Sequence, residues 1–295
     1  MRYFLITILA VVIQATTAAA WGPNGHRITA QIGEDNLNDA AAERLEDITQ
    51  GRSLALMATW PDYVRSYSEY DCLKPMHFLT VEDGQDINTA LAKRPFGSGA
   101  CKMDSFNALN MPANVVDAIH YFADIVGGDA GKAADFEQML SANGAAPYNG
   151  SIAQTALLLL VHFVGDVHQP LHVGRGPDRG GNTITVEWFS EYVNLHKVWD
   201  ELLIEREALS YSEYAAFLEQ RFAGTGVAGN GTKPLAWAQE SVGHRDQVYD
   251  FGPASAYNVP RLQYKYAADQ DELIKTRLYQ GGVRLSQILN AVLGD

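Results

Sequence analysis

Histidine and aspartate occur four residues apart at three places in the 295-residue sequence. The three pairs are His162 with Asp166, His196 with Asp200, and His120 with Asp124. Positions i and i+4 of an α-helix share one face, so each pair can direct an imidazole and a carboxylate at one point. Both groups are common zinc ligands, with bonds of about 2.0–2.2 Å. The same spacing is also typical of a hydrogen-bonded pair on a helix surface.

The surrounding sequence separates one pair from the others. His162 and Asp166 interrupt the most apolar stretch of the chain, residues 155–167. Burying an imidazole and a carboxylate there is costly unless a charged group compensates, so this pair favours a metal site. His120 and Asp124 have no such context, and we expect them to form an ordinary surface pair.

For the other candidate residues, spacing alone does not show whether they belong to the same site as His162 and Asp166. His172 lies beyond Pro170, which ends the apolar helix, so its imidazole can reach a second ion. Asp62 alone is typical of a turn or helix cap, His77 of a half-buried core histidine, and Trp21 of an exposed aromatic near a terminus.

Composition limits the function classes. The chain carries a net charge of −13 and is 47% hydrophobic, which is ordinary for one large globular domain or two small ones. Its acidity excludes a nucleic-acid binder that relies on a basic surface. It does not exclude an enzyme that binds phosphate through metal ions.

The N-terminus predicts export. Arg2 precedes an apolar run over residues 4–13, and small residues lead to Ala20, as in a secretory signal peptide cleaved after that residue. A membrane anchor is the alternative, but the run is shorter than the ~20 residues that span a bilayer. We therefore expect a signal peptide over residues 1–20 and a secreted or periplasmic protein without a membrane anchor. In an oxidising compartment Cys72 and Cys101 would form a disulfide; two unpaired buried thiols are the alternative.

The remaining pattern is mostly helical, without an internal repeat or an interdomain linker. Alternation over residues 183–188 predicts one strand, which follows a turn. We expect one compact, mainly α domain over residues 21–295 with a small β-hairpin. Apolar spacing and end signals predict helices over residues 26–37, 40–48, 112–126, 151–169, 195–205, 212–222 and 262–292.

Several short segments, taken in order, resemble the zinc-dependent type I nucleases, which are single-strand-specific and include mung bean nuclease. They are more distantly similar to the secreted bacterial zinc phospholipases C. The segments are Trp21-Gly-Pro-Asn-Gly-His26, Trp60-Pro-Asp62 with Arg65, Met76-His77-Phe78, the stretch from His162 to His172, Gly180-Gly181-Asn182, and Asn194-Leu-His196-Lys-Val-Trp-Asp200.

The resemblance implies the fold of these enzymes and a cluster of three zinc ions. The first ion would take Asp62, His77, His162 and Asp166, and the second His172, His196 and Asp200. The third would take His26, the shared Asp166, and the free amine and carbonyl of Trp21. An amine can bind a metal only after the preceding peptide bond is cut, so cleavage after Ala20 would complete the site.

The resemblance also implies a hydrolase that acts on single-stranded DNA and RNA and has 3′-nucleotidase activity. Zinc lowers the pKa of bound water to about 7, so hydroxide can attack phosphorus and leave 5′-phosphorylated products. Asp62 would orient the water, and Arg65 would hold phosphate charge unless it is a solvated surface residue. Phe78 would stack on an unpaired base. Which acidic residue beyond Phe78 contacts the base edge stays open.

Two alternatives remain at this stage. A phospholipase C would use similar metals on lipid headgroups, although we expect glutamate in that family at the place of Asp200. A zinc-storing protein would bind metal without catalysis. We expect a monomer that binds nucleic acid as substrate and forms no stable complex with it.

Overall fold

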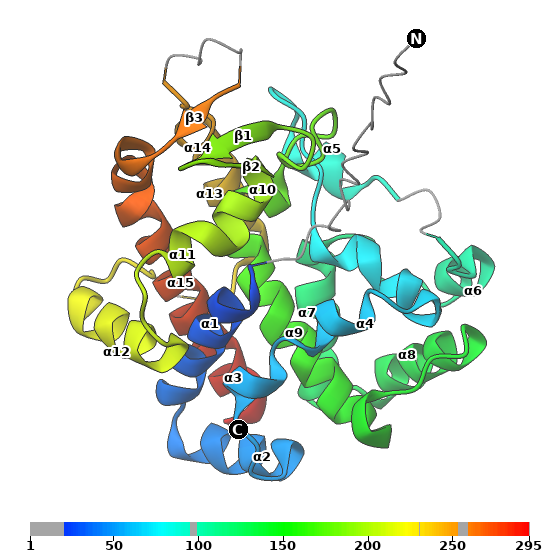
Figure 1. The fold of residues 1–295 in the computed structure, drawn as a ribbon. Coiled ribbons are helices and arrows are strands. Elements are labelled where there is room, and N and C mark those ends of the chain that lie inside the picture. The colour runs from blue at the N-terminus through cyan, green and yellow to red at the C-terminus, as the bar shows by residue number, and fades with distance from the viewer. Residues whose placement is uncertain (1–20, 95–98, 230, 253–258, 295) are drawn as a thin grey trace, which may run out of the picture.

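The computed structural model describes residues 21–94, 99–229, 231–252 and 259–294 (Figure 1). The predicted signal peptide, residues 1–20, lies outside the described residues. Helices dominate, and a small sheet accompanies them, so the predicted mainly α class is confirmed. Within the described ranges, no helix is both long enough and apolar enough to cross a bilayer.

The α-helices fall into long ones that build the core and short ones that connect them. The longer helices are α1 (Pro23–Asp35), α2 (Asp39–Thr49), α7 (Val115–Val126), α8 (Ala130–Ala142), α9 (Ile152–His168), α12 (Tyr211–Phe222), α13 (Pro234–Gly243) and α15 (Tyr264–Leu293). The shorter ones are α3 (Leu54–Met57), α4 (Trp60–Val64), α5 (Ile87–Leu91), α6 (Met103–Ala108), α10 (Leu195–Lys197), α11 (Leu203–Glu205) and α14 (Arg245–Val248).

Four segments have tighter or wider helical turns. Three are 3₁₀-helices and the last is a π-helix: η1 (Ser68–His77), η2 (Tyr148–Gly150), η3 (Pro170–Val173) and η4 (Val198–Leu202).

The sheet has the strand order β2-β1-β3. Strands β1 (Thr185–Trp188) and β2 (Glu191–Asn194) form the predicted hairpin, with antiparallel pairing that places Thr185 opposite Asn194. The third strand, β3 (Arg261–Leu262), pairs parallel with β1. Sequence analysis did not predict β3, because two residues are too few for an alternating pattern.

Helix α9 runs through the middle of the molecule, and α1, α7, α13 and α15 pack against it (Figure 1). Its sequence explains this position, because leucine, valine and phenylalanine occur on all sides and every residue from Gln154 to His168 is buried. Ser151 caps its first turn by accepting from the Gln154 N–H, and Pro170 prevents its continuation.

The core has two parts, and the chemistry-bearing residues lie where they meet. One part gathers around α7, α8 and α9 and contains Met76 and Val167, sequence neighbours of His77 and Asp166. The other gathers around the sheet, α12 and the first half of α15. It contains Leu171, Leu195 and Trp199, the sequence neighbours of His172, His196 and Asp200.

Three predicted helix starts were wrong by two or three residues. The helix expected from residue 26 begins at Pro23, because proline is well accommodated in the first helical turn. The helix expected from residue 112 begins at Val115, because the Asn114 side chain accepts from the Asp117 N–H and caps it there. The helix expected from residue 262 begins at Tyr264, because residues 261–262 join the sheet. Helix α8 was not predicted, since its alanine-rich sequence lacks a clear apolar period.

The predicted disulfide is present between Cys72 and Cys101, which are 29 residues apart. We predict that replacing both cysteines by alanine lowers the free energy of unfolding by about 3–4 kcal/mol, because the unfolded chain regains loop entropy. Urea unfolding of the oxidised protein and the double variant measures the difference. As a control, a reductant should destabilise the parent protein and not the variant; equal stabilities would contradict the prediction.

Candidate metal centre

Helix α9 contributes the two residues around which the site is built. His162 and Asp166 lie one turn apart on α9, and both side chains are fully buried. The His162 Nε2 atom lies 3.6 Å from the Asp166 carboxylate. The sequence prediction that this pair differs from a surface pair is therefore supported by its burial.

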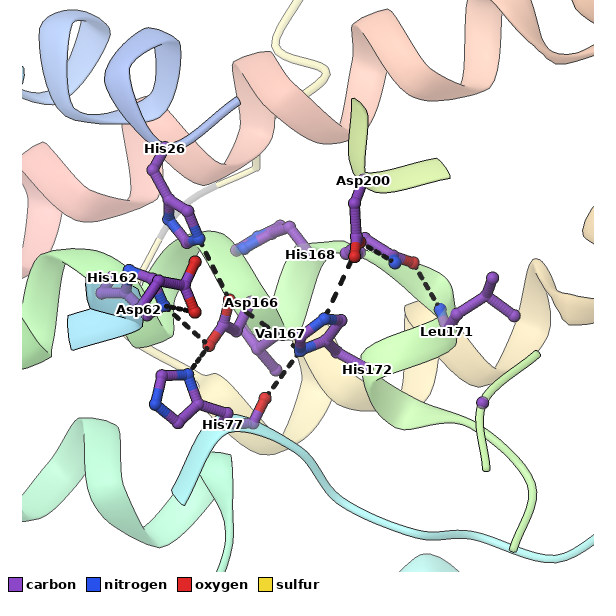
Figure 2. A network of polar contacts seen from close by, with 12 residues as sticks. His26, Asp62, His77, His162, Asp166, Val167, His168, Leu171, His172 and Asp200 are labelled. Atoms are coloured by element: carbon purple, nitrogen blue, oxygen red, sulfur yellow. Dashed lines mark hydrogen bonds and ion pairs between the residues drawn. The ribbon is translucent and has the colours of Figure 1, made fainter. Parts of the chain in front are cut away.

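Three other elements bring donors to this pair, as Figure 2 shows. His26 of α1 places Nε2 3.4 Å from Asp166 Oδ1, and its ring stacks on His162 at a centroid distance of 3.6 Å. His77, the last residue of η1, places Nδ1 3.1 Å from Asp166 Oδ2. Asp62 of α4 places Oδ1 3.6 Å from His162 Nε2.

A second group lies beyond the end of α9. His196 Nε2 lies 3.2 Å from Asp200 Oδ2 and 3.1 Å from His172 Nε2. His172 is on η3, which Pro170 starts, and Asp200 lies in the π-helical turn η4. A π-turn changes which side chains share a face, and such turns are frequent at functional sites.

The donor atoms form three groups that could each hold a metal ion. In each group the atoms lie within 4.8 Å of one another: His26, His162 and Asp166; Asp62, His77 and His162; and His172, His196 and Asp200. Eight of the nine predicted ligands thus meet at one place. Asp166 is grouped with His26, as predicted for the third ion. The grouping differs from the predicted one in that His162 belongs to two groups and Asp166 is not grouped with Asp62 and His77.

Several buried donor atoms of the site make no hydrogen bond to the protein. Neither nitrogen of His26 makes a hydrogen bond, and the same is true of His77 Nε2, His162 Nε2 and Asp166 Oδ1. Unsatisfied buried groups of this kind are rare, because each loses its hydration without compensation. Lone pairs of buried imidazoles and a carboxylate that point at one spot fit a divalent cation.

Burial also sets the protonation states that a metal needs. It lowers the pKa of His26 and His77 well below the usual value and lowers that of His162, so these rings are neutral ligands near pH 7. It raises the pKa of Asp166 well above its usual value and that of Asp200 to about 6, because desolvation outweighs the lowering effects of Arg65 on Asp166 and of His196 on Asp200. A bound cation would reverse the cost of ionising both carboxylates.

Backbone carbonyl groups fix the histidine rings. The Nδ1 atoms of His162, His172 and His196 donate to the carbonyl oxygens of Ala58, His77 and Gly180, at 2.9, 2.8 and 2.5 Å. Because each of these hydrogen bonds holds the ring proton on Nδ1, the lone pair of Nε2 is left to bind a metal ion in the site.

A glutamine that the sequence analysis missed fixes Asp200. The Gln169 side chain donates to Asp200 Oδ1 at 2.7 Å and accepts from the Leu171 N–H at 2.6 Å (Figure 2). In the sequence, its position just before Pro170, within the motif from His162 to His172, was the only indication of this role.

Trp21, the ninth predicted ligand, is fully buried beside these groups. The N–H of Gly22 donates to the carbonyl oxygen of Asp200 at 2.7 Å, which ties this end of the chain to η4. Gly165 allows α1 to approach α9, because a Cβ atom there would lie 2.8 Å from His26 Nδ1 and 3.4 Å from Trp21 Cδ1. The three groups consist of histidine and aspartate side chains only, so the role of the Trp21 amine and carbonyl stays a prediction.

The remaining predicted site residues lie at the edge of the site. The Arg65 Nη1 atom is 3.1 Å from Asp62 Oδ1, so Arg65 is not a freely solvated arginine. Phe78 is exposed and directly follows His77. His120 and Asp124 lie on the surface, as predicted, but Asp124 forms its ion pair with Lys132 and not with His120.

Two buried arginines of α15 hold the C-terminal end of α9 in place. Arg277 donates to the His168 carbonyl oxygen at 3.0 Å, and Arg284 donates to His168 Nε2 at 2.9 Å. His168 must therefore be neutral, with Nδ1–H donating to the Val164 carbonyl oxygen at 2.7 Å. Glu240 accepts from both arginines at 2.6 Å. This network fixes α9 two residues from Asp166.

Comparison with known proteins places the chain among nucleases. The family model described as S1/P1 Nuclease matches residues 21–294. Endonuclease 2 of Arabidopsis thaliana is 26% identical over 98% of this chain and 96% of its own length. Nuclease P1 of Penicillium citrinum is 26% identical over 93% of this chain and 98% of its own length. Nuclease S1 of Aspergillus oryzae is 28% identical over 72% of this chain and 66% of its own length.

We predict that Glu240→Gln lowers the free energy of unfolding by about 2 kcal/mol or more at pH 7, because charge-assisted bonds to two buried arginines are lost. Although burial alone would raise the pKa of Glu240, the Arg284 and Arg277 hydrogen bonds lower it below its usual value of 4.5. Its contribution is therefore full above pH 4.5 and disappears as pH falls through the lower folded-state value. Urea unfolding at several pH values measures this.

Glu272→Gln is the matched control for this prediction. Glu272 pairs with Arg221 on the surface, where an ion pair contributes little. A Glu240→Gln variant no less stable than Glu272→Gln, or one whose deficit does not shrink as the pH is lowered below 4.5, would contradict the prediction.

Proposed function

The chain belongs to the S1/P1 nuclease family and is a hydrolytic nuclease, and we propose that it uses three zinc ions to cleave single-stranded DNA and RNA. The proposed products are 5′-phosphorylated nucleotides and oligonucleotides, with 3′-nucleotidase activity alongside. The proposal is carried by the convergence on Asp166 of three buried imidazoles, those of His26, His77 and His162, each of which has a nitrogen without a hydrogen-bond partner.

Zinc matches the donor set better than a hard cation does. Five of the eight grouped residues are histidines: His26, His77, His162, His172 and His196. The other three are Asp62, Asp166 and Asp200, so the site is rich in nitrogen donors. Magnesium and calcium prefer oxygen ligands, whereas imidazole with carboxylate suits zinc. When bound, zinc supplies Lewis acidity toward phosphate and lowers the pKa of bound water.

Trp21 would complete the third zinc site through its α-amine and carbonyl. Its amine becomes a ligand only after cleavage of the bond to Ala20, so we propose a signal peptide over residues 1–20 and a catalytic domain over 21–295. The family match from residue 21 supports this boundary. The mature enzyme would act as a monomer in the periplasm or outside the cell.

Three residues would handle the substrate. The Arg65 guanidinium, which shares the Asp62 oxygen with His162, would donate to a phosphate oxygen of the strand. Asp62 would orient the attacking water, since it is the grouped residue with the most exposed side chain, at 16%. Phe78 would stack on an unpaired base, because its ring is exposed while hydrogen bonds hold the backbone on both sides of it.

The proposed metal content has a direct test. We predict about three zinc ions per processed chain by elemental analysis, and fewer in Asp166→Asn, because Asp166 lies among donors from three other elements. One zinc ion per chain in the parent protein would contradict the proposal. Asp124→Asn should retain the full metal content.

We predict that Asp166→Asn reduces hydrolysis of single-stranded DNA and RNA by at least about a thousandfold, because Asp166 is the proposed shared ligand and its loss removes zinc. Each cationic contribution to stabilising phosphate charge is worth about 10²–10³, and zinc-activated water is lost in addition. Asp124→Asn, a surface residue with the same His-x3-Asp spacing, should retain activity. Nucleotide release is measured with zinc-loaded mature protein. Phosphatidylcholine is tested in parallel, and release of diacylglycerol without nucleotides would overturn the nuclease assignment in favour of a phospholipase C.

A further inference from the structure

Residues 78–82 run alongside η3 as one segment, which we call the platform segment. Phe78, its first residue, has extended backbone angles. Along the segment burial alternates, because Leu79 and Val81 are buried whereas Phe78 is exposed. Successive side chains of an extended chain point to opposite sides, so the backbone position of this segment determines where the Phe78 ring emerges.

Backbone hydrogen bonds attach the platform segment to η3. The Leu79 N–H donates to the carbonyl oxygen of His172 at 2.9 Å, and the Val81 N–H donates to that of Gly174 at 3.0 Å. At the other end of this contact, His172 Nδ1 donates to the carbonyl oxygen of His77 at 2.8 Å. The position of the segment is therefore set relative to two of the grouped histidines.

The side chain of Arg245, the first residue of α14, joins the same two elements. Its Nη1 atom donates to the carbonyl oxygens of Val81 at 2.5 Å and Val173 at 3.3 Å. Its Nη2 atom donates to Asp83 Oδ1 at 3.2 Å. One guanidinium thus bonds the platform segment, the residue that directly follows His172 on η3, and the turn beyond the segment. Several donors in one rigid plane are specific to arginine.

The burial of Arg245 serves the backbone contacts. Its side chain is 5% exposed, whereas that of its partner Asp83 is 65% exposed. An ion pair with Asp83 alone could form at the surface, as Arg175 shows by donating to the same carboxylate oxygen at 2.9 Å. Burying a cation is costly, so the interior position of Arg245 is explained by the two carbonyl oxygens that it reaches there.

We propose that Arg245 is a positioning residue for the single-stranded substrate. It holds the platform segment against η3, so that the Phe78 ring meets an unpaired base at a fixed place beside the metal centre. This inference rests on the proposed nuclease function. Because Arg245 is buried and acts only through Phe78, its loss should weaken substrate binding and leave the chemical step unchanged. An aromatic ring on a loosened backbone must be ordered when the base binds, which lowers affinity.

The first test is a double-mutant cycle that measures KM and kcat for a single-stranded DNA oligomer with the zinc-loaded mature protein. Arg245→Ala should raise KM about threefold or more and leave kcat within about twofold of the parent value, since part of one stacking contact is lost. In the Phe78→Ala background it should change KM no further, because the ring that it positions is absent. Arg175→Ala, which removes the other arginine bound to Asp83, is the matched control and should keep the parent KM.

The second test does not depend on activity. Amide hydrogen exchange, measured by mass spectrometry on peptides that cover residues 78–82, should be faster in Arg245→Ala than in the parent protein. The reason is that the Leu79 and Val81 N–H groups would separate from η3 more often. Peptides from the centre of α9 should exchange at the parent rate, which would show that the change is local.

Each outcome decides the inference. A KM rise that disappears in the Phe78→Ala background, together with faster exchange over residues 78–82, supports it. An unchanged KM, an equal rise in both backgrounds, the same rise in Arg175→Ala, or unchanged exchange overturns it while the nuclease function stands. If the parent protein hydrolyses no oligomer, the proposed function fails and the inference fails with it.

Thermal unfolding and zinc content verify that all variants are folded and loaded. Should Arg245→Ala not fold, Arg245→Lys takes its place in the same cycle. Lysine keeps the charge and the apolar stem, but its single ammonium group lacks the planar fork that bonds three acceptors. The same KM rise, lost in the Phe78→Ala background, is therefore expected of it, and its absence overturns the inference.

Discussion

The buried carboxylate of Asp166 is the constraint on which the structure depends. Among the described residues its ion-pair partners are the imidazoles of His26, His77, His162 and His172, and burial disfavours a positive charge on each of these rings. Without a cation, the folded chain bears the desolvation of all these groups at once. A metal-free site of this composition lowers the stability of the folded chain. The ion that the site would hold explains why these groups are nevertheless buried.

Precise placement of so many donors requires support from outside the site. Carbonyl oxygens orient three of the histidine rings, and Gln169 orients Asp200. On the far side of α9, Arg277 and Arg284 bind His168 and share Glu240. These buried arginines bind the same helical turn that presents Asp166. The geometry of the metal centre therefore depends on the packing of helix α15 against α9.

The sequence predicted those parts of the site in which local spacing determines geometry. The i, i+4 relation on an apolar helix was enough for His162 and Asp166, and burial distinguishes them from His120 and Asp124, which have identical spacing. Asp62 and His77 lie on short helical segments that no periodicity connects to α9. Only the ordered set of motifs predicted that they belong together.

The supporting contacts were beyond prediction for a different reason. Ala58 and Gly180 act through their carbonyl oxygens, which every residue type possesses, so their side chains give no signal. The network of Glu240 with Arg277 and Arg284 joins residues 37 and 44 positions apart across two helices. Such pairings follow from tertiary packing, as does the π-turn that carries Asp200.

The arrangement also reconciles an acidic chain with a polyanionic substrate. Most of the negative charge lies on the surface, whereas the interior groups would be neutralised and outweighed by divalent ions. Electrostatic attraction between the protein and the phosphates of the substrate is then confined to the side of α4, where Asp62 and Arg65 meet solvent. The segment from Asp62 to Phe78 forms this border, and the disulfide at Cys72 anchors its middle. This anchored segment thus carries two proposed metal ligands, Asp62 and His77, together with the proposed phosphate-binding Arg65 and base-stacking Phe78, so the position of the strand and that of the metal ions are fixed together.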